Sequence, residues 1–227
     1  MLAVLGLAFG LGMLHALDAD HIMTVSSISS ARPGWRTSLG FCARWAVGHA
    51  LSLWFIGAGV YLFGLAIPVR LSHYADAAVG VVLVAIGVWL VWDLKVRGAH
   101  AHFHRHDGLP AHAHWHRHES GSAESHRQDE HRHGHGAVLV GMLHGTAGSA
   151  PLLALIPISH LGSAWLAMGY LIVFGIGTLT AMVAFGFLLG GAYERIARWG
   201  GRVVHATRMA MAASAGLFGV YLLYGAV

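Results

Sequence analysis

Six long apolar segments account for most of this sequence and constrain its fold more than any other feature. A helix that crosses a bilayer needs roughly 20 mainly apolar residues. Such segments occur at residues 2–25, 38–66, 74–94, 137–159, 163–190 and 205–226. Only 11% of the 227 residues are charged, whereas soluble domains carry about 25%. The sequence therefore predicts an all-α, polytopic membrane protein with six transmembrane helices.

The basic residues are distributed unevenly between the two sides of the membrane. The first, third and fifth loops contain 12 of the 14 Lys and Arg residues. Loops rich in Lys and Arg stay in the cytoplasm, so we expect these three loops there and both termini outside. The first segment has no positively charged start, and we interpret it as a retained helix rather than a cleaved signal peptide.

The two halves of the chain match when one is shifted by 129 residues. Residues 12–15 and 141–144 are both Gly-Met-Leu-His, and the match continues without a gap across three segments. Because three is an odd number, the second half is expected to insert upside down. We predict a 3+3 inverted repeat, with one repeat at 1–95 and the other at 137–227. Such repeats are typical of transporters that bind substrate near the bilayer midplane.

Four potential metal ligands lie within the first segment: His15, Asp18, Asp20 and His21. A central charge costs about 2.5–3.5 kcal/mol on insertion scales, and such residues usually mark an ion pathway. On a regular helix with about 100° per residue, Asp20 cannot point in the same direction as the other three. Either the helix is locally unwound, or Asp20 has another role such as pairing with Arg44. Asp18 is expected to be either a metal ligand or a charge partner of Arg44.

Two further histidines are candidates for the same site. His49 lies within the second segment beside Gly48, which allows another backbone to come close, and His144 is the repeat counterpart of His15. For each, the alternative is a hydrogen bond to a neighbouring helix. Two glycines and a proline follow His144 and favour a helix break there as well.

The residue types narrow the choice of ion. Imidazole with carboxylate suits Ni, Co, Zn, Cu or Fe, whereas Cu(I) prefers thiolate or thioether ligands. Mg and Ca prefer sites made only of oxygen. Since a ligating histidine must be neutral, metal binding is expected to depend on pH.

The third loop, residues 96–136, contains 12 of the 19 histidines, mostly with His-x-His spacing. It has no hydrophobic pattern, so we expect it to be disordered without a ligand. We interpret it as a cytoplasmic collector or sensor of metal with low specificity. The alternative is a solvated linker that happens to be rich in histidine.

Residues 15–22 resemble the H-x4-D-H signature of the nickel/cobalt transporter family. Residues 141–149 and 174–178 are similar to its short, six-helix branch, which includes urease-accessory membrane proteins. The resemblance implies transport of Ni(II) or Co(II) across a bacterial inner (plasma) membrane, with His15, Asp20 and His21 at the family's functional positions. It also implies a link to maturation of nickel enzymes such as urease or hydrogenase. Family members include both importers and exporters.

We therefore expect a secondary transporter of Ni(II) or Co(II), with uptake favoured over export and with no resident cofactor. No nucleotide-binding motif is visible, and topology rather than nucleic acid explains the basic residues. The alternatives are an exporter, a membrane-anchored metal sensor or chaperone, and a membrane metalloenzyme. An enzyme would need several His boxes or a His-Glu-x-x-His helix. Glu194, near a helix end, is the only Glu outside the third loop, so we do not expect an enzyme.

Overall fold

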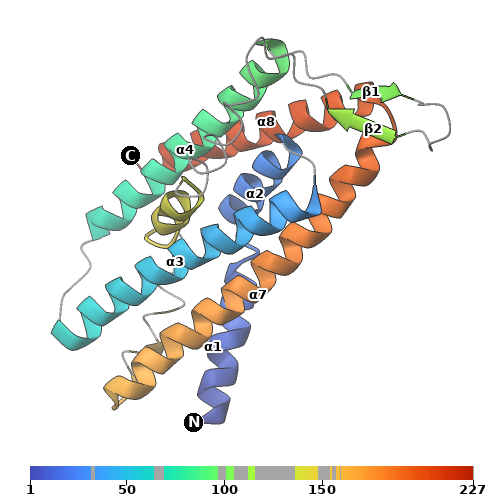
Figure 1. Ribbon diagram of the computed structural model, residues 1–227. Helices are drawn as coiled ribbons and strands as arrows, with labels where there is room; N and C mark the ends of the chain where they lie inside the picture. Colours follow the sequence, from blue (N-terminus) through green and yellow to red (C-terminus); the bar gives the residue numbers. More distant parts are fainter. Residues whose placement is uncertain are drawn as a thin grey trace, which may run out of the picture.

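The computed structural model of the chain describes residues 1–31, 34–63, 69–96, 101–104, 112–115, 136–147, 154, 157–158 and 160–226. Helices make up most of this part (Figure 1): α1 (Leu2–His15), α2 (Ala19–Ala31), α3 (Trp35–Phe63), α4 (Val69–Val96), α7 (Ala164–Ala197) and α8 (Gly201–Gly225). Residues 136–144 are also helical. The expectation of a helical protein is confirmed for these residues, apart from two short strands described below.

Four of the helices, α3, α4, α7 and α8, are long and apolar enough to cross a membrane individually. Helices α1 and α2 are bent by 55° at a short break and together provide a fifth candidate span. A helix satisfies its backbone hydrogen bonds internally, which makes it the stable form of such apolar segments in lipid. Large apolar side chains such as Leu188 and Leu217 are exposed on the outer surface. The chain is a multi-pass membrane protein.

The predicted span at 137–159 is the point at which the structure differs from the sequence-based expectation. The helix at 136–144 ends in a turn in which Thr146 N donates to Leu143 O and Ala147 N donates to His144 O. Most of the later residues of this predicted span lie outside the described ones. Four or five candidate spans are therefore present in the described part, and not six. Gly145 lies in this turn, and glycine is a common residue where a helix ends.

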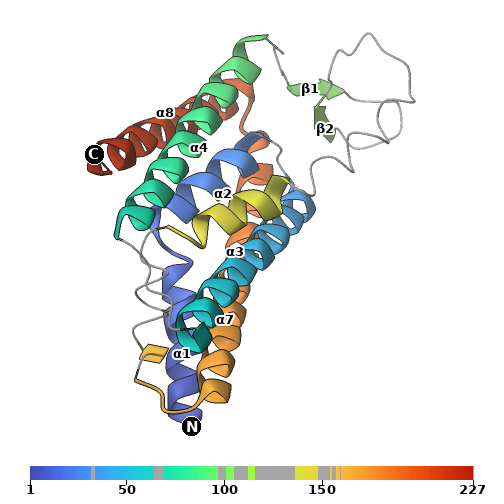
Figure 2. The same ribbon diagram turned by 90° about the vertical axis from the view of Figure 1, so that its left-hand side faces the viewer.

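Helix α2 lies in the interior of the helical bundle. Helices α1 and α3 both pack along α7, whereas α4 packs along α8 (Figures 1 and 2). Helix α2 contacts α3, α4, α7 and α8. The break after α1 therefore places the second half of the first predicted span among the other helices, and not at the lipid surface.

Helices α4 and α8 are joined by close backbone packing and by one ion pair. Gly87 faces the backbone of Ala212 and Gly216 so closely that a side chain there would collide with α8. Small residues allow membrane helices to approach in this way. The Nη2 atom of Arg208 lies 2.7 Å from Oδ2 of Asp93, and Arg208 is 2% exposed. Asp93 thus compensates a buried positive charge that would be costly alone.

Two short strands lie in the loop that was predicted to be disordered. Strands β1 (Ala101–His104) and β2 (His112–Trp115) pair antiparallel, with residue 102 opposite 114 and residue 104 opposite 112. The alternating sequence of these eight residues has the period of a strand. Disorder of the loop without a ligand stays a prediction. The loop residues 97–100, 105–111 and 116–135 lie outside the described ones.

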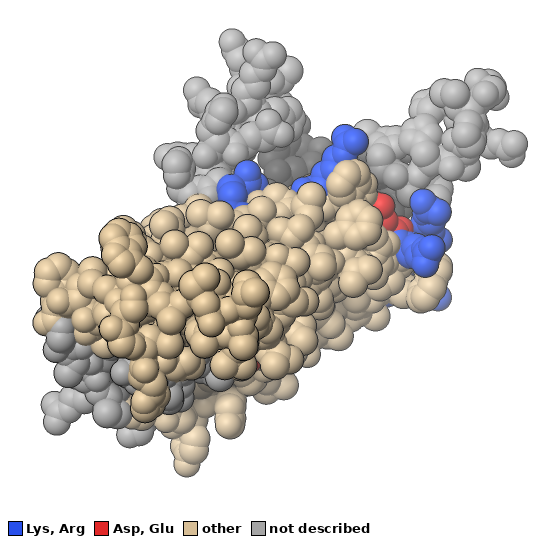
Figure 3. Space-filling view, turned by 90° about the horizontal axis from the view of Figure 1, so that it is seen from below, with Lys and Arg blue, Asp and Glu red and all other residues tan. Residues whose placement is uncertain are grey.

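Basic side chains gather at one end of the bundle. The amide N of Trp35 donates to Oε1 of Glu194 at 3.1 Å, which joins the start of α3 to the end of α7. The arginines beside these two residues, Arg36 and Arg195, therefore lie at the same end. Figure 3 shows Lys and Arg along one edge of the face in view, most of which carries no charged side chain.

Candidate metal centre

The chain leaves its helical path directly after His15. Helix α1 ends at His15 and α2 begins at Ala19, and the three residues between them form a turn in which Asp18 N donates to His15 O at 3.0 Å. The sequence predicted that the histidines of this segment could converge with Asp20 only if the helix were unwound. The unwound turn is present, and it brings the ring centroids of His15 and His21 to 4.6 Å.

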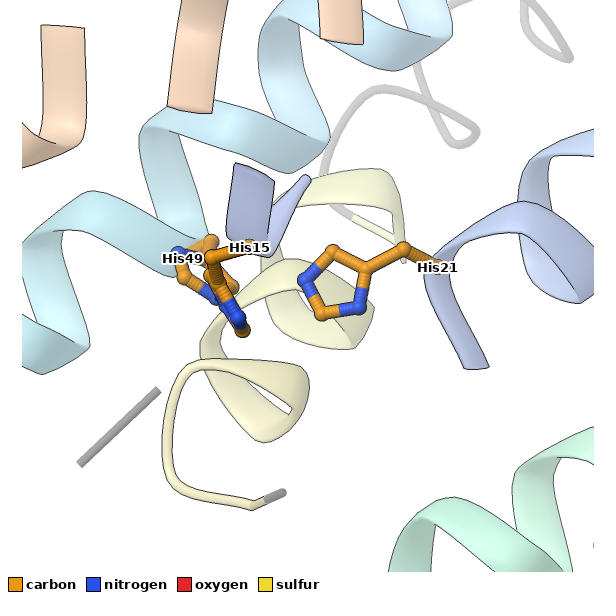
Figure 4. Close-up of side chains that lie close together, drawn as sticks. All are labelled: His15, His21 and His49. Carbon is orange, nitrogen blue, oxygen red and sulfur yellow. The ribbon is translucent and has the colours of Figure 1, made fainter. Parts of the chain in front are cut away.

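Three imidazoles from different segments meet at this break (Figure 4): His15 from α1, His21 from α2 and His49 from α3. Each offers one ring nitrogen, and the three nitrogens all lie within 4.8 Å of one another. All three residues are 0% exposed. Such a group has the residue types and spacing needed to hold a transition-metal ion.

Two carboxylates determine which nitrogen of His15 and His21 is available. Nδ1 of His15 lies 2.9 Å from Oδ2 of Asp18, and Nδ1 of His21 lies 2.9 Å from Oδ1 of Asp20. A carboxylate only accepts, so each Nδ1 carries the proton and each Nε2 keeps a lone pair. Carboxylates that orient histidines in this way are typical partners of metal-binding imidazoles.

The tautomer of His49 follows from its contact with His15. Their Nε2 atoms are 2.9 Å apart, and since Nε2 of His15 has a lone pair, His49 donates its Nε2 proton. Nδ1 of His49 and Nε2 of His21 are both buried and without a hydrogen-bond partner among the described residues. If an ion bound Nε2 of His49, the ring proton would move from Nε2 to Nδ1 of His49, and the ion would give Nε2 of His21 a partner. Buried polar atoms without partners are rare and costly, so the centre is better satisfied with a cation than without one.

The two aspartates therefore contact histidines and not Arg44. Asp18 and Asp20 lie at the edge of the cluster, with side chains 33% and 13% exposed. Arg44 is exposed on α3, and it forms no ion pair with either aspartate in the described structure. The expected charge pairing is not seen. Asp20 lies beside His21, and its role as an ion ligand stays a prediction.

His144 lies next to the cluster but outside the group of three. Its ring centroid is 5.6 Å from that of His21, and the side chain is 0% exposed. Nδ1 donates to Val140 O at 2.8 Å, and Nε2 is 3.1 Å from Oγ1 of Thr24.

Two aromatic side chains that the sequence did not single out enclose the histidines. Trp45 is fully buried, with its ring centroid 4.6 Å from His21 and 5.3 Å from His49. Phe174 stacks on His15 at 5.7 Å. Trp45 precedes His49 by about one helical turn, a spacing that could have suggested this role. Phe174 is distant in sequence, and nothing local connects it to the centre.

The fold and this centre define a multi-pass membrane protein with buried imidazoles placed to bind a metal ion between helices. Residues 8–221 match the family described as the cytochrome C biogenesis protein transmembrane region, and the chain belongs to that family. It is 29% identical over 201 residues to the urease accessory protein UreH of Bacillus sp. (strain TB-90), covering 87% of this chain and 81% of that protein. The resemblance to urease-accessory membrane proteins is thereby confirmed. No solved structure matches the chain.

Proposed function

We propose that this protein is a secondary transporter of Ni(II), with Co(II) as the alternative substrate. The observation that carries the proposal is the group of three fully buried imidazoles at the break of a membrane helix. Broken helices that surround a site inside the membrane are typical of transporters. Nitrogen ligands suit nickel and cobalt, and the preference for nickel follows the resemblance to the nickel/cobalt transporter family.

In this proposal the ion binds Nε2 of His15, His21 and His49. Asp18 and Asp20 hold the first two rings in the required tautomer and balance the charge of the cation. Asp20 thus supports a ligand instead of being one, which revises the role that the family resemblance suggested. His144 stays a candidate for a further ligand.

We also propose that the membrane part is a 3+3 inverted repeat. The support comes from four glycines, at each of which an added Cβ would overlap a backbone carbonyl oxygen of a neighbouring helix. The contacts are Gly12 with Phe174, Gly141 with Trp45, Gly177 with Phe9, and Gly48 with Val138. A shift of 129 residues converts the first contact into the second and the third into the fourth. Two equivalent pairs are expected if a twofold axis relates the halves.

Buried hydroxyl side chains along α2 support a route for the ion between the three-histidine centre and the end of the bundle that carries the arginines. Thr24, Ser26, Ser27, Ser29 and Ser30 are all buried along this helix. On the other side of the break, the core around α1 is apolar. Hydroxyl oxygens can replace water around a moving cation, whereas an apolar core cannot. With the arginine-rich loops in the cytoplasm, this route would release an imported ion into the cell.

Two features support a role in nickel handling without catalysis. The relative UreH is named a urease accessory protein, so the imported ion would serve urease or another nickel enzyme. Glu194 accepts a hydrogen bond from Trp35 N at the end of the bundle, and it is not placed to act as a base at the centre.

Flux of metal through purified protein tests the proposal directly. In liposomes with a pH gradient, the wild-type protein is expected to move Ni(II), and Co(II) to a smaller extent, whereas Mg(II) and Ca(II) should not move. Oxygen-preferring ions lack suitable ligands in a centre of three imidazoles. Metal-resolved mass spectrometry of the liposome interior provides the measurement. Tight nickel binding without flux would instead support the membrane-anchored sensor.

The direction of transport is tested in cells. Cells that express the protein are expected to contain more nickel than cells that carry an empty vector. A lower nickel content would establish export and overturn uptake.

Replacing Asp20 with Asn is expected to weaken nickel binding by about 10–100-fold, the usual effect of removing a carboxylate that orients a metal-binding histidine. The amide has nearly the same shape but no charge, and it no longer requires a proton on Nδ1 of His21. Equilibrium dialysis of the detergent-solubilised protein measures the change.

Asp76→Asn on α4 is the matched control and should bind nickel as the wild type does. Wild-type affinity in Asp20→Asn would show that the carboxylate does not support the site. A complete loss, as large as that from removing His21, would mean that Asp20 binds the ion directly.

A further inference from the structure

Thr24 contacts both His144 and the segment that forms the three-histidine centre. Its Oγ1 atom lies 3.1 Å from Nε2 of His144 and 2.8 Å from the backbone oxygen of Asp20. Thr24 and His144 are both 0% exposed, so no solvent competes for these contacts. Thr24 therefore has contacts on both sides, with the segment that forms the centre and with the helix at 136–144.

The protons at this contact can be counted. The Val140 carbonyl only accepts, so Nδ1 of His144 carries the ring proton and Nε2 has a lone pair. The Thr24 hydroxyl has a single proton and two acceptors within reach, Nε2 of His144 and the backbone oxygen of Asp20. Whenever the proton turns to Asp20, Nε2 of His144 is buried without a donor, at a cost that a metal ion would remove.

The three-histidine centre is also one donor short of a four-coordinate site. Square-planar or tetragonal surroundings of nitrogen and oxygen are characteristic of Ni(II). Asp18 and Asp20 already contact the Nδ1 atoms of His15 and His21. His144 is a further candidate, since its ring packs perpendicular to that of His21 at 5.6 Å. It belongs to the second half of the chain, whereas the other three histidines belong to the first.

We propose that Thr24 is a positioning residue that hydrogen-bonds Nε2 of His144 while the centre is empty. Nε2 of His144 then becomes the fourth ligand when an ion binds. When an ion occupies the three histidines, the Thr24 proton turns to the Asp20 oxygen and Nε2 of His144 binds the ion. Metal binding would then join the two halves of the protein, which is a way to couple occupancy to the movement of one half against the other. This inference rests on the proposed function, because it assumes that the three-histidine centre binds metal.

The test compares Thr24→Val, which keeps the shape but removes the hydroxyl, with Thr24→Ser, which retains it. Thr24→Val is expected to bind Co(II) about 2–10-fold more tightly, since the ion no longer competes with a hydrogen bond of ordinary strength. Thr24→Ser should behave as the wild type. Thr178→Val is the matched control, because the Thr178 hydroxyl is also buried but, among the described residues, donates to the backbone oxygens of Gly12 and Phe174 and to no histidine.

Two further measurements separate a ligand change from a structural effect. The visible absorption spectrum of bound Co(II) reports its coordination, and His144→Ala is expected to change that spectrum in protein with a native Thr24. In the His144→Ala background, Thr24→Val should no longer change the affinity, since a double-mutant cycle isolates the coupling between the two residues.

The outcomes are distinct. If wild-type protein binds no metal, the proposed function itself fails. If the wild type binds Co(II) but His144→Ala leaves the spectrum unchanged, His144 is not a ligand and the inference is overturned. It is equally overturned if Thr24→Val binds with wild-type affinity.

Discussion

Replacing His21 with alanine is expected to abolish nickel transport and to weaken nickel binding by more than about 100-fold, because removing a ligand costs more than removing a carboxylate partner, which costs about 10–100-fold. His21 is the histidine of the group whose Nε2 has no hydrogen-bond partner among the described residues. Its lone pair is therefore available to an ion without breaking a contact. Nickel binding by equilibrium dialysis and flux in liposomes provide the two measurements.

The same substitution at His205, which is exposed on α8, is the control and should leave binding and flux unchanged. Size-exclusion chromatography must show that the His21→Ala protein is folded, so that lost binding is not lost structure. Nickel flux at the wild-type rate in His21→Ala would exclude the three-histidine centre as the transport site.

Alanine at Gly48 or Gly141 is expected to prevent stable assembly of the helices that carry the centre. At Gly141 the added Cβ would overlap the Trp45 carbonyl oxygen, and at Gly48 it would overlap that of Val138. These obstacles are backbone atoms, which cannot rotate away as the end of a flexible side chain can. Overpacking of this kind costs about 1–3 kcal/mol and occasionally more. Separation of these helices would also move His49 away from His144.

The loss should appear as a lower temperature of aggregation in detergent and as a smaller fraction of monodisperse protein on size-exclusion chromatography. Gly169→Ala on α7 is the matched control, because an added Cβ there meets no atom within 4 Å. Alanine also has the higher helix propensity, so the control should be at least as stable as the wild type. Equal stability of Gly141→Ala and Gly169→Ala would contradict the close packing of these helices.

The helical segments could be predicted because the lipid environment leaves few alternatives to a helix. The bounds of α3 and α7 differ by only a few residues from the segments expected at 38–66 and 163–190. A break in the first span was one of the two alternatives that the sequence allowed, since His15, Asp20 and His21 cannot converge on a regular helix, and the bend of 55° between α1 and α2 agrees with it. Strands in the histidine-rich loop were not expected, because a short polar hairpin has no hydrophobic pattern to reveal it.

The roles of the charged residues could not be predicted in the same way. Sequence spacing allowed Asp18 and Asp20 to be ligands or partners of Arg44, and a one-dimensional pattern cannot decide between them. The turn at residues 16–18 directs both carboxylates toward imidazole Nδ1 atoms and leaves Arg44 exposed.

The sequence by itself determined that this chain is helical, crosses the membrane several times, and carries four potential metal ligands within the first span. These conclusions depend on composition and local geometry, which are properties of neighbouring residues. Only the tertiary structure showed that His49 lies beside His15 and His21, and that Thr24 contacts both the Asp20 backbone oxygen and His144. These contacts join different helices, and close glycine packing between helices determines which side chains meet.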